Sequence, residues 1–90
     1  MKYTVKFTGQ FKKDYKLAVK QNKNIEKLVD VIETLAEGKT LDESYRDHLL
    51  IGKYKGNHEC HIEPDWLMIY EYIGETLLLE RLGSHSELFK

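Results

Sequence analysis

Pro64 divides the middle of this 90-residue chain into two stretches with the patterns of β-strands. Residues 57–62 alternate in character, and residues 66–72 are rich in aromatic and branched side chains. Proline has no N–H for a sheet ladder and pushes the residue before it, Glu63, toward an extended conformation. The sequence therefore predicts two adjacent strands joined by a tight turn at residues 63–65.

The first of these strands concentrates titratable side chains on one face. Because successive side chains of a strand alternate, its two faces carry Asn57, Glu59 and His61, and His58, Cys60 and Ile62. The turn that follows adds further carboxylates. We therefore expect a functional site along one face of this strand and its turn.

A metal motif is suggested only superficially by the order His58-x-Cys60-His61. Cys60 and His61 point to opposite faces of a strand, and no second ligand cluster completes a tetrahedral site. We therefore predict no metal and no cofactor. Cys60 is interpreted as a small, buried apolar side chain.

Length and composition predict a single domain over residues 1–90. No stretch approaches the roughly 20 apolar residues of a membrane-spanning helix, and no signal-peptide core is present. A lone cysteine cannot form an internal disulfide, which suits a reducing compartment. We expect a cytoplasmic protein with no membrane partner.

Charge is segregated along the chain, although the formal net charge is only −1. Residues 1–24 contain seven lysines and one acidic residue, Asp14, whereas residues 25–90 carry a net charge of −7. A basic segment on an otherwise acidic chain fits attraction to a polyanion. A solvated, lysine-rich helix face explains the pattern equally well.

Two amphipathic helices are predicted after a first strand at residues 2–7. The first begins at Thr8 or Gly9 and places apolar side chains at helical spacing, with lysines over much of the remainder. The second has the clearer apolar stripe, formed by Ile25, Leu28, Val29, Ile32, Leu35 and Ala36. Gly38 stands where a C-cap glycine belongs. The two helices are expected to form a hairpin.

Polar candidates also come from outside the central strands. Residues 39–51 are predicted to be a long loop that delivers His48. Residues 76–82 form a last strand interrupted by Arg81, which is costly inside a sheet unless its charge is paired or binds an anion. The predicted fold class is α+β, an antiparallel sheet packed against a helical hairpin in the order β-α-α-β-β-β.

The collected polar residues suit cleavage of RNA through attack by its own 2′-oxygen. The set is His48, Glu59, His61, Asp65, Arg81 and His85. This reaction needs a base, an acid and positive charge on the phosphate. Histidine serves both proton roles near neutral pH, carboxylates orient imidazoles, and arginine binds phosphate. The residues alone leave a nuclease as one of several interpretations.

Several longer motifs make the hypothesis more specific. They are Asp47-His48-Leu49, Gly52-x-Tyr54-Lys55-Gly56, the run from His61 to Tyr70, the run from Arg81 to Phe89, and the early run from Gly9 to Asp14. Over nearly the whole chain these motifs resemble the YafQ-type toxins of the RelE/ParE superfamily. The resemblance implies a RelE-like fold and a bacterial type II toxin that cleaves mRNA in the ribosomal A site and is neutralised by a cognate antitoxin.

The resemblance also implies which positions are functional. They are His48, Glu59, His61, Asp65, His85 and Phe89. Glu59 departs from the pattern, because the family commonly has aspartate there and the glutamate carboxylate lies one methylene further from the backbone. A displacement of about 1 Å can cost on the order of 100-fold in rate.

We assign roles within this set as a hypothesis. His85 is the acid for the leaving oxygen and His48 is the base, and exchange of these two roles is nearly as well supported. His61 positions or relays a proton, and Glu59 and Asp65 hold imidazoles. Substrate contacts are assigned to Arg81 at the scissile phosphate, to Phe89 by stacking on a base, and to the basic residues Lys12, Lys13 and Lys16.

The predicted partners are a cognate antitoxin, the 70S ribosome and mRNA, with operator DNA reached through the antitoxin. One alternative is a non-catalytic, ParE-like toxin of the same fold that acts by binding a protein target. Another is an RNA-binding module. Three histidines argue against a pure binding surface, which has no need of imidazoles.

Overall fold

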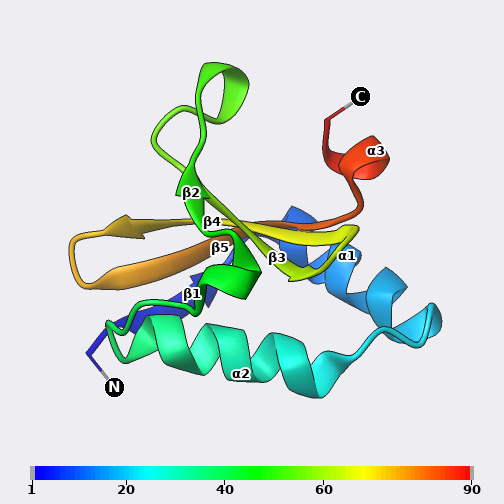
Figure 1. Ribbon diagram of the computed structural model, residues 1–90, viewed down its shortest axis with the longest axis horizontal. Coiled ribbons are helices and arrows are strands. Elements are labelled where there is room, and N and C mark those ends of the chain that lie inside the picture. The colour runs from blue at the N-terminus through cyan, green and yellow to red at the C-terminus, as the bar shows by residue number, and fades with distance from the viewer. Residues whose placement is uncertain (1, 90) are drawn as a thin grey trace.

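The centre of the fold is a five-stranded sheet with the strand order β1-β5-β4-β3-β2 (Figure 1). In this computed structural model, which describes residues 2–89, the strands are β1 (Thr4–Phe7), β2 (His48–Leu49), β3 (His58–Glu63), β4 (Trp66–Ile73) and β5 (Thr76–Gly83). The helices are α1 (Gly9–Lys20), α2 (Ile25–Ala36) and α3 (His85–Leu88), with single helical turns η1 (Glu43–Tyr45) and η2 (Gly52–Tyr54) on either side of β2. The predicted α+β class and β-α-α-β-β-β order are confirmed, and β2 and α3 are additional short elements.

One edge of the sheet differs from the expected antiparallel arrangement. β2 to β5 pair antiparallel, but β1 pairs parallel with β5, in a register that places Thr4 opposite Thr76. A tight turn forces neighbouring strands to run antiparallel, whereas β1 and β5 are far apart in the sequence and no turn sets their direction. The sheet is therefore mixed.

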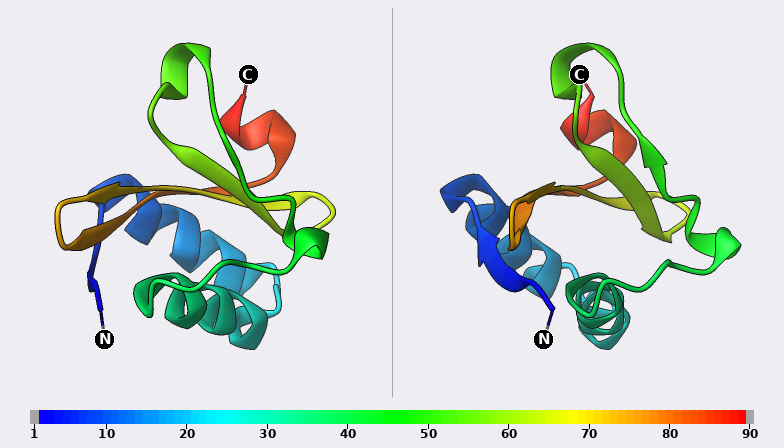
Figure 2. Two further views of the ribbon diagram at one scale, coloured as in Figure 1. Left: turned by 60° about the vertical axis from the view of Figure 1, so that its left-hand side comes forward. Right: turned by 90° about the vertical axis from the view of Figure 1, so that its left-hand side faces the viewer.

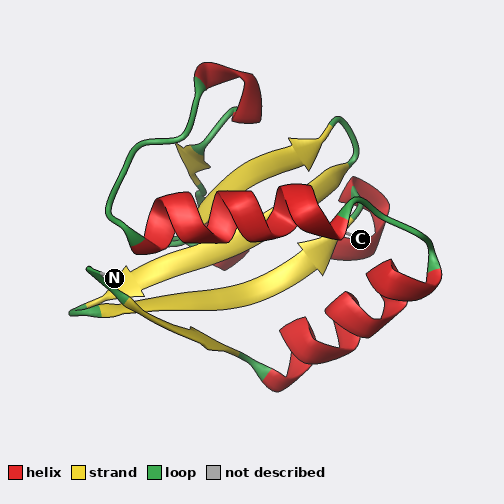
Figure 3. Ribbon diagram, turned by 90° about the horizontal axis from the view of Figure 1, so that it is seen from below, coloured by secondary structure: helices red, strands yellow, loops and turns green. Residues whose placement is uncertain are grey.

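α1 and α2 lie on one face of this sheet, as the views in Figures 2 and 3 show. The main core fills the space between helices and sheet and includes Phe11, Leu28, Leu35, Trp66 and Tyr70. A smaller apolar cluster on the opposite face joins Leu67, Ile69 and Leu88. Within residues 2–89, no helix is both long and apolar enough to cross a membrane.

Local sequence signals explain where the two long helices begin and end. The Thr8 side chain accepts a hydrogen bond from the Phe11 N–H, and the Asn24 side chain accepts one from the Lys27 N–H. Gly38 follows α2 with a φ of +75°, a conformation that favours glycine. The predicted helical hairpin is confirmed.

The central hairpin also follows the prediction. β3 and β4 pair antiparallel on either side of the turn at Pro64 and Asp65. Cys60 and Ile62 point into the main core, as alternation requires. The segment 39–51 is less of a loop than expected, because η1 and β2 occupy part of it, so His48 lies on a strand.

Candidate active site

Glu59 joins two histidines on the sheet face opposite α2. Its Oε1 atom lies 3.1 Å from Nε2 of His48 and 3.2 Å from Nε2 of His61. The pairing of β2 with β3 places His48 directly across from Glu59, and His61 is two residues further along the same face of β3. Glu59 is only 5% exposed, so its carboxylate is shielded from water while it holds both imidazoles.

The substitution of glutamate for the aspartate of the family pattern fits this geometry. Both contacts of Glu59 are within hydrogen-bonding distance, and both reach the same carboxylate oxygen. A negative carboxylate at this distance stabilises the imidazolium that forms when either histidine takes up a proton.

A second histidine–carboxylate pair is built where the β3–β4 turn meets the start of α3. Oδ1 of Asp65 accepts hydrogen bonds from the His85 backbone N–H at 3.0 Å and lies 2.9 Å from His85 Nδ1. The bond from the His85 backbone N–H, followed by the bond from its ring, lowers the pKa of Asp65. With Nδ1–H donated to Asp65, Nε2 of His85 is the nitrogen left to exchange a proton with a substrate.

α3 presents His85 through a local capping arrangement. The Ser84 side chain accepts from the Glu87 N–H, and Glu87 Oε1 accepts from the Ser84 N–H at 2.8 Å. This reciprocal pair is a capping box, which fixes the start of a short helix. His85 is thereby held in place by its own helix terminus as well as by Asp65.

The two pairs meet to form one polar row. The rings of His61 and His85 lie with their centroids 5.6 Å apart and an angle of 62° between their planes. The row therefore runs from His48 through Glu59, His61 and His85 to Asp65. All five predicted catalytic residues are brought together, although they come from β2, β3, a turn and α3.

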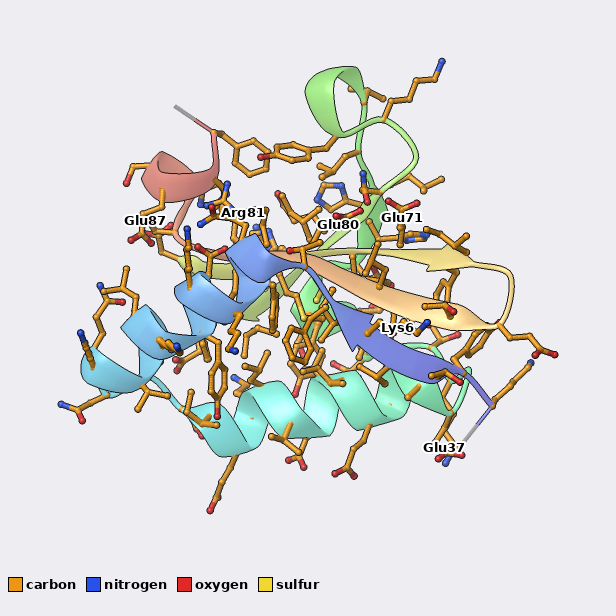
Figure 4. All side chains as sticks on the ribbon, turned by 180° about the vertical axis from the view of Figure 1, so that it is seen from behind. Lys6, Glu37, Glu71, Glu80, Arg81 and Glu87 are labelled. Atoms are coloured by element: carbon orange, nitrogen blue, oxygen red, sulfur yellow. The ribbon has the colours of Figure 1, made fainter. Side chains whose placement is uncertain are left out.

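Arg81 lies near this row but is already engaged by α1. Its Nε atom lies 2.9 Å from Oδ2 of Asp14, and Nη2 lies 3.4 Å from Oδ1. The hydrogen bond to Asp14 is the main cause of a raised pKa for Arg81, and Tyr54 adds to it. Figure 4 shows Arg81 where α1, β5 and α3 approach one another. Arg81 was expected to have either a paired charge or a bound anion, and it pairs with Asp14.

Asp14 also completes the edge of the sheet. β1 covers only the first half of β5, and Oδ2 of Asp14 accepts a hydrogen bond from the Leu82 N–H at 3.0 Å beyond that point. Asp14 had no predicted role. Its position as the lone acidic residue among residues 1–24 was the available signal.

Aromatic side chains border the row on the side of α3. Phe89 is 43% exposed and contacts the ring of Tyr54 edge-on, with centroids 5.7 Å apart. It also lies 6.3 Å from the ring of His85. Phe89 is therefore not a core residue, as expected, whereas Tyr54 was missed. Lys12, Lys13 and Lys16 are exposed on α1 and are not part of the polar row.

His48, Glu59 and His61 also form a group that could hold a metal ion. One ligand atom from each lies within 4.8 Å of the others. Imidazole nitrogens and a carboxylate oxygen suit a zinc or copper ion. The metal motif suggested by the sequence was His58, Cys60 and His61. The trio of His48, Glu59 and His61 was missed, because strand pairing brings His48 next to Glu59. Cys60 is fully buried, and burial raises the pKa of its thiol.

The family model described as "Bacterial toxin of type II toxin-antitoxin system, YafQ" matches residues 3–90. This chain belongs to the YafQ toxin family. It is 40% identical over 86 residues to the mRNA interferase toxin YafQ of Escherichia coli (strain K12), and the match covers 94% of each chain.

Two solved structures extend the comparison with the YafQ family. The crystal structure of the E. coli DinJ-YafQ complex matches with a TM-score of 0.90 and 38% identity, over 98% of this chain and 99% of that chain. The crystal structure of a metal-bound toxin from Helicobacter pylori matches with a TM-score of 0.91 and 42% identity, over 97% and 99%. These matches confirm the predicted family and its α+β architecture.

Proposed function

We propose that this YafQ-family toxin is an endoribonuclease that cleaves mRNA on the ribosome. The observation that carries the proposal is the polar row, in which two histidine–carboxylate pairs lie side by side, one on the open face of the sheet and one where the β3–β4 turn meets α3. The side chains of His48 and His85 are 51% and 54% exposed, so both can reach a substrate. The name of the E. coli relative, an mRNA interferase, supports the same activity.

The mechanism divides the two proton transfers between two histidines. His48 takes the proton of the RNA 2′-hydroxyl, the 2′-oxygen attacks the adjacent phosphorus, and the bond to the 5′-oxygen breaks. His85 gives a proton to that leaving oxygen, and the products are a 2′,3′-cyclic phosphate and a 5′-hydroxyl. Glu59 stabilises the imidazolium formed on His48, Asp65 orients His85, and His61 lies between them.

The substrate is held by groups around the row. Arg81 is proposed to face the scissile phosphate, with Asp14 fixing the direction of its guanidinium. Phe89 is proposed to stack on a base, which its exposure permits. The ribosome is expected to meet the lysine surface, defined here as Lys12, Lys13 and Lys16.

A cognate antitoxin is the proposed protein partner. An apolar groove of about 440 Å³ runs between α1, α2 and β1, lined by side chains that include Phe7, Tyr15 and Val29, with Lys12 and Lys16 among them. An amphipathic antitoxin segment with apolar and acidic side chains suits such a groove. The complex of the E. coli relative with DinJ supports this partnership. Operator DNA would be reached through the antitoxin, and a cytoplasmic site of action follows.

The first test separates an enzyme from a binding toxin. A positioned acid or base contributes about 10²–10⁴-fold to a rate, so His85→Ala should abolish most cleavage while ribosome binding persists. Primer extension on a translated message measures the cuts, and growth after induction measures toxicity. A His85→Ala protein that still arrests growth without cutting mRNA would favour the non-catalytic, ParE-like alternative.

The second test concerns metal. Because side chains supply both proton transfers, cleavage should persist when transition metals are removed and the magnesium required by the ribosome is held constant. Activity that disappears on stripping and returns with added zinc or copper would instead assign His48, Glu59 and His61 to a metal centre.

A further inference from the structure

Asp47 ties the strand that carries His48 to the core of the protein. Successive side chains of an extended segment point to opposite sides, so Asp47 faces the core when His48 faces Glu59. The Asp47 side chain is 24% exposed, compared with 51% for His48. Asp47 therefore lies on the core side of the sheet, and His48, the next residue, lies on the open side with Glu59.

The partner of Asp47 is the hydroxyl of Tyr70 on β4. This hydroxyl donates a hydrogen bond to Oδ1 of Asp47 at 2.7 Å, across the intervening strand β3. Tyr70 is 1% exposed, and its ring stacks on His58 with the centroids 5.0 Å apart and the planes 15° apart. Nδ1 of His58 lies 3.7 Å from the same Asp47 oxygen. The carboxylate thus lies at the edge of the core, bordered by the buried ring of Tyr70 and the partly exposed ring of His58.

β2 has a short ladder of its own. It is two residues long and occupies the edge of the sheet, and among the residues that the structure describes its one strand neighbour is β3. Arg46, immediately before Asp47, has a φ of +48°, in the left-handed region that non-glycine residues seldom adopt. The position of so short an edge strand is only weakly fixed by its backbone pairing with β3. The hydrogen bond from Tyr70 supplies a restraint from the rigid centre of the sheet.

We infer that Asp47 is a positioning residue that, held by Tyr70, fixes His48 against Glu59 for mRNA cleavage. The inference rests on the proposed function, since it concerns the geometry of that same site. Catalysis is sensitive to such geometry, because a displacement of about 1 Å can cost on the order of 100-fold in rate. Asp47 acts through His48 and does not itself touch the substrate.

The test measures single-turnover cleavage by toxin bound to mRNA-programmed ribosomes, together with ribosome affinity. Asp47→Ala should slow cleavage between about 10-fold and 100-fold while affinity stays unchanged. Asp47→Asn should stay within about 3-fold of the wild type, because the amide oxygen still accepts the Tyr70 hydrogen bond. Wild-type cleavage by Asp47→Ala, or equal slowing by Asp47→Asn, would overturn the inference.

Tyr70→Phe removes the donor and keeps the buried ring, and Tyr72→Phe is its matched control. The Tyr72 hydroxyl also donates a part-buried hydrogen bond from β4, but to the Leu35 carbonyl of α2 at 2.9 Å. Both variants should lose thermal stability, and only Tyr70→Phe should lose cleavage rate. Combining Tyr70→Phe with Asp47→Ala should slow cleavage no further than either change alone. Equal rates for the two tyrosine variants, or a multiplicative double variant, would contradict the assignment.

Hydrogen exchange tests the anchoring separately from nuclease activity. The Leu50 N–H donates to the Asn57 carbonyl at 2.8 Å and reports whether the β2 segment stays on β3. Tyr70→Phe should speed exchange at Leu50 by at least about 10-fold relative to the amides of β4 and β5. If the wild-type protein cuts no mRNA, the proposed function fails while this result still decides whether Tyr70 anchors β2. Unchanged exchange at Leu50 would overturn the anchor itself.

Discussion

Glu59 is the residue on which the geometry of the site most depends. One of its oxygens lies within 3.2 Å of two imidazoles, and its side chain is withdrawn from water. An aspartate side chain is one methylene shorter. Its carboxylate would lose contact with at least one of these imidazoles unless β2 moved closer to β3. The length of the glutamate side chain therefore matches the separation between His48 and His61 in this chain.

Substitutions at Glu59 should show this dependence. Glu59→Ala should slow mRNA cleavage by about 100-fold, because both imidazoles lose their orientation. Glu59→Asp should lie between that variant and the wild type, since its carboxylate can hold only one ring at the present spacing. Single-turnover cleavage on programmed ribosomes measures the rates.

Glu59→Gln is the matched control for charge. It keeps the length of the side chain and one oxygen acceptor, so it separates orientation of the rings from stabilisation of an imidazolium. Wild-type rates in Glu59→Ala would show that neither effect contributes.

The predicted residues and the missed ones differ in a physical respect. The histidines, Glu59 and Asp65 were predicted because their side chains are titratable and because they fall within the motifs of the resemblance. Asp47, Tyr54 and Asp14 act through contacts between residues far apart in the sequence, such as Asp47 and Tyr70, whose sequence separation is 23. Such contacts depend on which strands pair and in which register, and a single sequence does not specify either.

At the scale of elements, a bulge between β4 and β5 creates an unusual pair of carboxylates. The register shifts between Ile69 and Tyr70, so Glu80 is inserted where the ladder resumes. A hydrogen bond with Glu71, then burial and the charge of Glu71, raise the pKa of Glu80 to about 7. Figure 4 shows the pair on the same side of the sheet as Arg81.

This pair should make stability depend on pH. An unfolded Glu80 loses its proton near pH 4.5, whereas the folded one keeps it to about pH 7. Stability should therefore fall as pH rises from about 4.5 to about 7, by less than about 1 kcal/mol because the pair is partly exposed. Glu80→Gln should remove this decline, so its melting temperature should exceed that of the wild type more at pH 8 than at pH 5. Glu75→Gln, an exposed neighbour in the turn, should leave the decline in place.

The elements themselves were largely predictable. Caps at Thr8 and Asn24, the glycine after α2 and the proline turn are local signals, and each marked a real boundary. β2 was not predicted, because two residues are too few to show the alternation of a strand. The segment is a strand because it pairs with β3. The parallel direction of β1 was missed for the same reason, since it is set by a distant strand.

At the scale of the whole molecule, the two surfaces with proposed functions lie on different sides. The polar row lies on the open face of the sheet, and the lysine surface lies on α1 in the helical layer. Contact with ribosomal RNA and the cleavage chemistry are therefore assigned to different surfaces. Changes on α1 should alter association without altering the chemical step.

Replacement of Lys12, Lys13 and Lys16 by glutamate tests this division. Ribosome association should weaken, and the slope of log affinity against log salt should fall by about 2 if all three lysines neutralise phosphates. Single-turnover cleavage at saturating toxin should remain at the wild-type rate. Lys39→Glu changes an exposed lysine beyond α2 and controls for the charge change of one such substitution. An unchanged salt slope in the triple variant would leave the lysine surface with a solubilising role.

The parallel pairing of β1 with β5 has a consequence for how the toxin is made. Thr4 of β1 pairs with Thr76 of β5. A chain emerging during translation therefore cannot complete its sheet until most of it has been synthesised. His85 emerges later still, after the strand that β1 requires. The proposed active site is therefore incomplete while the chain is being synthesised, and it can form only after His85 has been made and β1 has paired with β5.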